Sequence, residues 1–291
     1  MRRVAFEIHN SHGDPLRGDV RFPEAPATGK LPAVVVCHGF KGFKDWGFFP
    51  YIGQRLAQAG MLAVAFNFSG SGIGPDLENF TEPERFAADT MSRQIDDLGV
   101  VLDALAAGAI GDGRADPRRL GALGHSRGAA TVILRAHVDV RLGALVAWAG
   151  VARLMRFSER ELAVWRARGH MEFLNTRTGQ TMRVDYTMVE DFERNRARFD
   201  VLGAVAELRL PLLLVHGEED LSVRVEEARE LQAAAPAGRS ELLVVPRTGH
   251  TFGAEHPWKG TTPALERALE HTIEWLHMGL GPGNLGSEHE P

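Results

Sequence analysis

Short apolar runs alternate with amphipathic segments along most of the chain. The runs have the length and the aliphatic composition of strands that are buried on both faces. They lie at Ala33–Cys37, Leu62–Phe66, Leu120–Leu123, Gly143–Trp148, Leu212–His216 and Glu241–Val245. Helical periodicity fills the intervals at Tyr51–Ala59, Ala88–Ala106, Ala129–Ala136, Glu226–Ala235 and Ala264–His277. This alternation predicts an α/β fold with a mostly parallel, doubly wound sheet.

The first residues of the chain follow a different pattern. Arg3–Ile8 and Leu16–Phe22 read as two strands joined by a turn at Asn10–Pro15. Such a spacing is typical of an antiparallel hairpin. We therefore expect the parallel sheet to carry an antiparallel pair at its start.

Residues 151–206 interrupt the alternation, because they contain no clear buried strand. Ser158–Arg168 and Asp185–Arg198 are charged amphipathic helices by their pattern, and Met171–Val184 is a candidate hairpin. The segment leaves the sheet where a strand ends, so we expect a cap over the active site; a purely stabilising surface elaboration is the alternative. Its apolar side chains available for closure are Trp165, Phe173, Tyr186 and Phe192. Residues 1–150 and 207–278 then form the core, and the glycine-rich residues 279–291 a flexible tail.

The strongest chemical signal is the sequence Gly124-His125-Ser126-Arg127-Gly128. It follows a strand candidate and precedes a helix candidate, which is the setting of a nucleophile elbow. The two glycines allow close approach of strand and helix, and the tight turn exposes the Ser126 hydroxyl at the helix N-terminus. Ser126 is therefore the candidate nucleophile.

A second signal, His38-Gly39-Phe40, directly follows another strand candidate. A backbone N–H in this turn can face the nucleophile and stabilise a developing oxyanion. We expect the N–H groups of Phe40 and Arg127 to form an oxyanion hole, and the Phe40 ring is a candidate wall of the acyl pocket.

Two further strands end in polar loops. The first continues into Glu218-Glu219-Asp220, and the second into a loop that ends in His250. With Ser126, these residues occur in the order serine, acid, histidine, which is the order expected of a catalytic triad on this fold. His250 would act as the base, and a carboxylate would orient its ring. The competing candidates are Glu218 and Glu219 for the acid and His256 for the base.

Aromatic residues are frequent in the loop between Phe40 and Tyr51. Phe43 and Trp46 in this loop, and Trp148 at the end of a strand, are candidates for a substrate pocket. Ordinary packing of the loop is the alternative.

Composition excludes several classes of protein. The chain has 291 residues, a net charge of −5 and one cysteine, Cys37. No basic face, disulfide framework or cysteine zinc site is indicated, so we expect no nucleic-acid partner, metal or cofactor. The chain also lacks the apolar run of a signal peptide or a membrane span, so we expect a cytoplasmic protein without a membrane partner.

Together these motifs resemble the α/β-hydrolase superfamily over nearly the whole chain. The sequences His38–Gly42, Asp116–Leu120 and His216–Asp220 are similar to those of the dienelactone-hydrolase and prolyl-oligopeptidase-like group. Within that group, short serine esterases such as cinnamoyl and feruloyl esterases are the nearest likeness. The resemblance implies that Asp220 is the triad acid. Dienelactone hydrolases use a cysteine nucleophile, whereas the elbow here holds Ser126.

The sequence thus predicts a serine hydrolase that cleaves small-molecule carboxylic esters through an acyl-enzyme. A serine peptidase or amidase is the first alternative. A non-catalytic binding protein with a hydrolase fold, and an acyltransferase, are further alternatives. The acyl group, the alcohol and the oligomeric state are left open.

Overall fold

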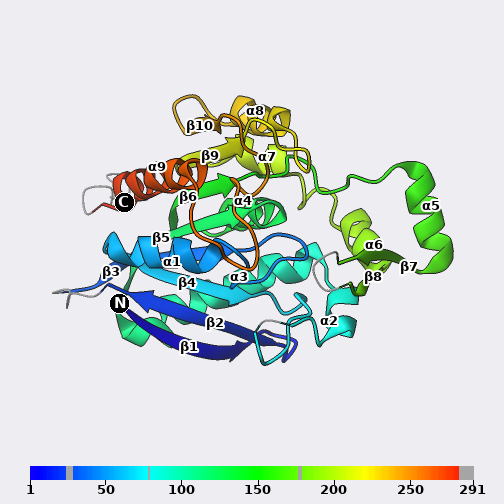
Figure 1. Cartoon of the computed structure of the whole chain (residues 1–291), viewed down its shortest axis with the longest axis horizontal. Coiled ribbons are helices and arrows are strands. Elements are labelled where there is room, and N and C mark those ends of the chain that lie inside the picture. The colour runs from blue at the N-terminus through cyan, green and yellow to red at the C-terminus, as the bar shows by residue number, and fades with distance from the viewer. Residues whose placement is uncertain (24–28, 78, 176–178, 282–291) are drawn as a thin grey trace, which may run out of the picture.

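An eight-stranded sheet runs through the protein, with helices on both faces and a smaller cap beside it (Figure 1). This computed structural model describes residues 1–23, 29–77, 79–175 and 179–281. The sheet contains, in spatial order, β1 (Arg2–His9), β2 (Pro15–Phe22), β4 (Leu62–Asn67), β3 (Leu31–Cys37), β5 (Ala115–His125), β6 (Leu142–Trp148), β9 (Leu212–Gly217) and β10 (Ser240–Val245).

The direction of the strands agrees with the sequence pattern. β1 and β2 pair antiparallel, β2 pairs antiparallel with β4, and the strands from β4 to β10 pair in parallel. The predicted α/β fold with an antiparallel start is therefore confirmed. Because the carboxyl ends of the parallel strands lie at one edge of the sheet, the loops that follow β3, β5, β9 and β10 converge there.

Strand β3 shows why the central runs are apolar throughout. Ala33, Val35 and Cys37 pack into the core on one face, whereas Val34 and Val36 pack into the core on the other. Alternate residues of a strand point to opposite faces. A strand covered by helices on both sides therefore needs an apolar side chain at every position.

Helices cover both faces of the sheet. One face packs against α1 (Phe49–Gln58) and α9 (Pro263–Gly279). The other packs against α3 (Met91–Ala106), α4 (Arg127–Val138), α7 (Val201–Ala206) and α8 (Val225–Ala234). The starts of the two longest helices carry threonine caps, since Thr90 and Thr262 accept backbone N–H groups of α3 and α9. No helix in the described ranges is long and apolar enough to cross a bilayer.

The inserted segment forms most of the cap. It contains α5 (Glu159–Arg168), the antiparallel pair β7 (His170–Leu174) and β8 (Thr181–Asp185), and α6 (Thr187–Arg194). The short α2 (Pro83–Ala87) of the core contacts β8, and a 3-10 turn (Gly111–Gly113) precedes β5. Phe43, Phe86 and Trp165 belong to a shared apolar cluster, so the cap packs on core loops through buried aromatic rings.

The structure places two boundaries differently from the sequence pattern. The expected cap includes Val201–Ala206, but Val201 and Val205 of this helix are buried in the main core. The expected tail begins at residue 279, but Leu280, which directly follows α9, is 2% exposed and packs in the apolar cluster between α9 and the sheet. Both segments are anchored by apolar side chains that contact the sheet. Residues 282–291 of the expected tail lie outside the described residues.

Candidate active site

Ser126 sits on a sharp turn between β5 and α4. Its backbone has φ 58° and ψ −123°, a conformation that L-residues adopt only under constraint. The flanking glycines permit the turn: a Cβ on Gly124 would lie 2.1 Å from the Gly128 carbonyl oxygen, and one on Gly128 would lie 2.5 Å from that of His38. The Ser126 N–H donates to the Trp148 carbonyl at 2.8 Å. Strand, turn and helix thus hold the hydroxyl at the N-terminus of a 12-residue helix.

The loop after β3 passes directly beside this turn. A Cβ on Gly39 would lie 2.9 Å from the Cβ of Ser126, so only glycine fits there without a shift. His38 braces the loop: its Nδ1 donates to the Gly39 carbonyl at 2.9 Å, and its Nε2 accepts the Phe68 N–H at 3.4 Å. Burial lowers the pKa of His38 to about 4, so the ring is neutral at pH 7. Its role is to hold the loop in place through these two hydrogen bonds.

Asp220 follows β9 and is almost completely buried. Its Oδ1 accepts the N–H groups of Ser222 at 2.8 Å and Val223 at 2.9 Å, and its Oδ2 lies 2.7 Å from Nδ1 of His250. Burial alone would raise the pKa of this carboxyl. Hydrogen bonds from His216, His250 and the Val223 N–H outweigh burial and hold the pKa well below its usual range. Asp220 is therefore a carboxylate in the folded protein.

His250 lies in the loop after β10 and keeps 22% of its side chain exposed. Because Nδ1 donates to the Asp220 carboxylate, Nε2 is the nitrogen left to accept a proton. His125 supports this loop, since its Nε2 donates to the His250 carbonyl at 2.9 Å. Burial lowers the pKa of His125 to about 3, with a further contribution from His250, so this neighbouring ring is neutral.

The competing candidates lie elsewhere. Glu218 and Glu219 are exposed, whereas Asp220 is buried against His250. His256 accepts the Gly47 N–H at 3.0 Å and stacks on Trp46, and it is not among the residues that line a cavity with Ser126. The structure therefore places Asp220, and neither glutamate, in contact with His250.

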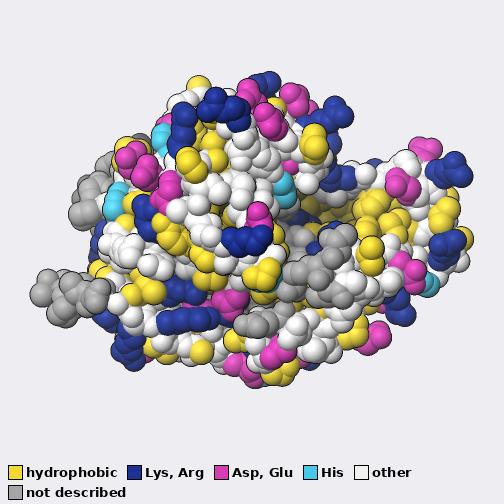
Figure 2. Space-filling model, in the orientation of Figure 1, with side chains coloured by type: hydrophobic (Ala, Val, Ile, Leu, Met, Phe, Trp, Pro, Cys, Tyr) yellow, Lys and Arg dark blue, Asp and Glu magenta, His cyan; other side chains and the backbone are white. Residues whose placement is uncertain are grey.

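Ser126 and His250 line one cavity of about 350 Å³. Within the described part of the chain, the Ser126 hydroxyl has no hydrogen-bond partner. It is therefore available to a molecule that enters the cavity. Core and cap both contribute to the wall, and Figure 2 shows hydrophobic side chains gathered in the hollow between the core and α5. The remaining lining residues are Phe40, Lys41, Arg127, Val151, Leu154, Arg156, Phe157, Phe173, Met188, Ser222 and Val223.

The three expected pocket aromatics are placed elsewhere, because none of them is among these lining residues. Phe43 is 1% exposed within the cluster shared by core and cap. Trp46 packs against Phe48 and His256. Trp148 is fully buried on the α9 side of the sheet, where its indole Nε1 donates to Thr272 Oγ1 at 2.9 Å.

The cap supplies lining residues that no local sequence motif marks. Arg156, Phe157 and Met188 all come from the inserted segment, while Phe173 is the one expected cap aromatic that reaches the cavity. Trp165, by contrast, is completely buried inside the cap. The only sequence signal for such residues was the concentration of apolar side chains within a charged insertion.

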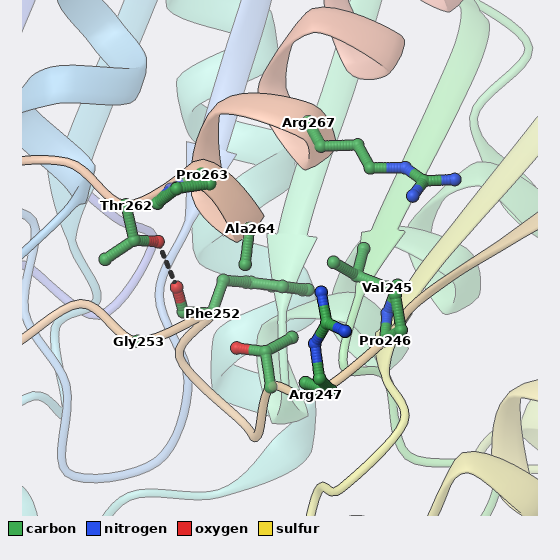
Figure 3. Close-up of a pocket in the computed structure, with 10 residues that line it drawn as sticks. Val245, Pro246, Arg247, Phe252, Gly253, Thr262, Pro263, Ala264 and Arg267 are labelled. Carbon is green, nitrogen blue, oxygen red and sulfur yellow. Dashed lines mark hydrogen bonds between the residues drawn. The ribbon is translucent and has the colours of Figure 1, made fainter.

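A second cavity, of about 370 Å³, lies between the end of β10 and the start of α9 (Figure 3). Thr262 Oγ1 donates to the Phe252 carbonyl at its edge, at 2.6 Å. Two arginines, Arg247 and Arg267, line it, but its wall contains no serine, histidine or carboxylate. Among the described residues, no three His, Cys, Asp or Glu side chains gather as a metal site requires.

Comparisons with known proteins agree with this architecture. Residues 34–264 match the family described as "Alpha/beta hydrolase family". A search of curated proteins found no match. The crystal structure of the esterase domain of a Rhodothermus marinus protein is similar, with a TM-score of 0.65 and 20% identity over 97% of this chain and 100% of that one.

Two further solved structures are similar at comparable levels. Est1E from Butyrivibrio proteoclasticus has a TM-score of 0.65 and 16% identity, over 94% of this chain and 96% of its own. A puromycin-hydrolyzing peptidase from Mycobacterium tuberculosis has a TM-score of 0.68 and 20% identity, over 96% of this chain and 39% of its own. At these identities the likeness establishes a shared fold.

Proposed function

Because the chain belongs to the alpha/beta hydrolase family, we propose that it hydrolyses carboxylic esters through an acyl-enzyme on Ser126. One observation carries this proposal. The Asp220 carboxylate, whose Oδ2 is 2.7 Å from Nδ1 of His250, orients that ring in a cavity that Ser126 also lines. A serine, a histidine and a buried carboxylate in this arrangement are the components of a nucleophilic triad.

In the proposed reaction, His250 Nε2 takes the hydroxyl proton as Ser126 Oγ attacks the ester carbonyl carbon. The tetrahedral intermediate collapses when His250 returns that proton to the leaving alcohol oxygen. Water then attacks the acyl-enzyme with the same assistance, which releases the carboxylic acid and restores Ser126. Asp220 stays charged throughout and stabilises the imidazolium form of His250. The only second substrate required is water.

We assign the oxyanion hole to the backbone N–H groups of Phe40 and Arg127. Two observations support this. Both residues line the cavity with Ser126, and neither N–H has a hydrogen-bond acceptor within the described residues. Unpaired N–H groups at a helix N-terminus and a neighbouring loop favour negative charge at the carbonyl oxygen. Removing one such donor costs roughly 10²–10³ in turnover in other serine hydrolases.

A fluorophosphonate probe and a substrate panel test the proposal. The probe should label the wild-type protein but not Ser126→Ala, and p-nitrophenyl ester hydrolysis should fall by about 10⁵–10⁶ in that variant. Ser222→Ala is the matched control, since Ser222 lines the same cavity outside the elbow. Labelling that survives in Ser126→Ala would contradict the assignment. Faster cleavage of aminoacyl-anilides than of the esters would indicate a peptidase.

A further inference from the structure

The charged side chains that line the cavity beside Ser126 are basic, although the protein is acidic. Its lining includes three cationic side chains, Lys41, Arg127 and Arg156, and no carboxylate. The whole chain has a net charge of −5. A charge of one sign in a hollow with apolar walls concentrates the electric field there and attracts ligands of the opposite sign.

The three cations differ in how far their charge is already neutralised. Arg156 donates to Glu227 at 2.6 Å and to the Ser222 carbonyl at 3.1 Å, so its guanidinium has partners. Lys41 is exposed and has no ion pair among the described residues. Its Nζ lies 5.8 Å from the ring centre of Phe40 and 6.0 Å from that of Phe173. The ammonium group is therefore available to a ligand at the aromatic wall.

Arg127 is fixed in position but keeps unused donors. Its Nη2 donates to the buried carboxylate of Asp89, which Gln94 Nε2 holds in turn at 2.6 Å. Its guanidinium carbon lies 4.6 Å from the ring centre of Phe40, as in a cation–π contact. Among the residues that the structure describes, its Nη1 has only the sulfur of Met188 as an acceptor, at 3.7 Å, and a thioether is a weak acceptor. A ligand oxygen would satisfy this donor far better.

Resting on the proposed function, we infer that the preferred ester carries a carboxylate, bound by Lys41 and Arg127. The apolar part of the substrate packs against Phe40 and Phe173. Arg127 directly follows Ser126 in the chain, so a carboxylate bound by Arg127 lies near the ester bond that Ser126 attacks. The carboxylate and that bond therefore belong to one small molecule. Arginine and lysine are the residues that bind carboxylates most strongly, and the apolar wall strengthens the attraction by excluding water.

Two pairs of esters test this inference. In the first, p-nitrophenyl hydrogen glutarate carries the carboxylate on the acyl side, and p-nitrophenyl hexanoate is its neutral partner. In the second, 4-acetoxybenzoate carries it on the leaving group, and methyl 4-acetoxybenzoate is neutral. For at least one pair, wild-type kcat/KM should be about tenfold or more higher for the charged ester, as expected for one charge-assisted contact. The preferred pair identifies the side of the ester on which the carboxylate lies.

Variants of Lys41 test whether the preference for the charged ester arises in this cavity. Lys41→Met should lower the charged-to-neutral ratio about tenfold, mainly through a higher KM for the charged ester, and Lys41→Glu should bring the ratio below one. Raising the salt concentration should lower the wild-type ratio as well. Lys30→Met, at a lysine outside the cavity lining, should leave both rates unchanged.

The outcomes separate the two hypotheses. If the neutral esters are cleaved at Ser126 but no charged ester is preferred, or if Lys41→Met leaves the ratio unchanged, the inference is overturned while the proposed function stands. If none of the four esters is cleaved and the fluorophosphonate probe does not label Ser126, both are overturned.

Discussion

The α-carbon of Gly39 faces Ser126 so closely that a methyl group on it would lie 2.9 Å from the Ser126 Cβ. The contact fixes the spacing between the loop that carries the Phe40 N–H and the turn that carries the nucleophile. A side chain at residue 39 must push these two segments apart. Because oxyanion stabilisation depends on donor positions near 3 Å, a small displacement has a large effect on rate.

Gly39→Ala should therefore lower kcat for p-nitrophenyl esters by roughly 10²–10³. Gly249→Ala is a matched control beside His250, since a Cβ there would make only an ordinary contact, at 3.6 Å from the Glu219 carbonyl oxygen. Steady-state kinetics on folded protein, checked by circular dichroism, measures the difference. Equal activities of the two variants would show that the close approach of Gly39 has no role in catalysis.

Replacing the acid of the proposed triad should impair catalysis strongly. In Asp220→Asn the amide favours the wrong tautomer of His250, so turnover should fall on the order of 10⁴. Glu219→Gln changes an exposed carboxylate in the same loop and should have little effect. Comparable losses in both variants would remove Asp220 from the triad.

The cap should limit the size of the substrate through Phe173, which lines the cavity. Phe173→Ala opens space at the wall, so the ratio of kcat/KM on p-nitrophenyl octanoate to that on the acetate should rise about tenfold or more. Phe192→Ala is the control, because Phe192 is a cap residue that lines a different hollow. Point variants are preferable to removing residues 151–206, since α7 within that range packs in the core. An unchanged chain-length profile in Phe173→Ala would contradict a size-limiting cap.

Stability should fall in mild acid because two neutral histidines are buried. Burial lowers the pKa of His38 to about 4 and that of His125 to about 3. Unfolded histidines protonate near pH 6.5, so below that pH the unfolded state binds more protons and the free energy of unfolding decreases. Each histidine contributes a slope of at most about 1.4 kcal/mol per pH unit.

Asp89 opposes this trend, because burial raises its pKa to about 6 and the folded state then binds an extra proton between about pH 6 and pH 4. Urea unfolding at several values between pH 7 and pH 4.5 measures the balance. His125→Gln should flatten the loss of stability, whereas Asp89→Asn should steepen it, and the exposed His9→Gln should change neither. A profile that His125→Gln leaves unaltered would contradict the assignment.

The sequence by itself determined the features that depend on local order. Apolar runs marked the parallel strands because a strand packed on both faces needs apolar residues at every position. The spacing of Gly124, Ser126 and Gly128 marked the elbow because its tight turn is formed within five consecutive residues. The strand ends before Asp220 and His250 were equally visible, and parallel strands bring such ends to one edge.

Only the tertiary structure decided which side chains face the substrate cavity. Trp148 ends a strand beside the elbow, yet its indole packs on the face of the sheet that α9 covers and donates to Thr272, 124 residues later in the chain. Phe173 and Arg156 reach the cavity that Ser126 lines because the insertion folds back over the sheet edge. Asp220 differs from Glu218 and Glu219 in being turned inward to His250. These orientations follow from contacts between segments far apart in sequence, which no local pattern of residues encodes.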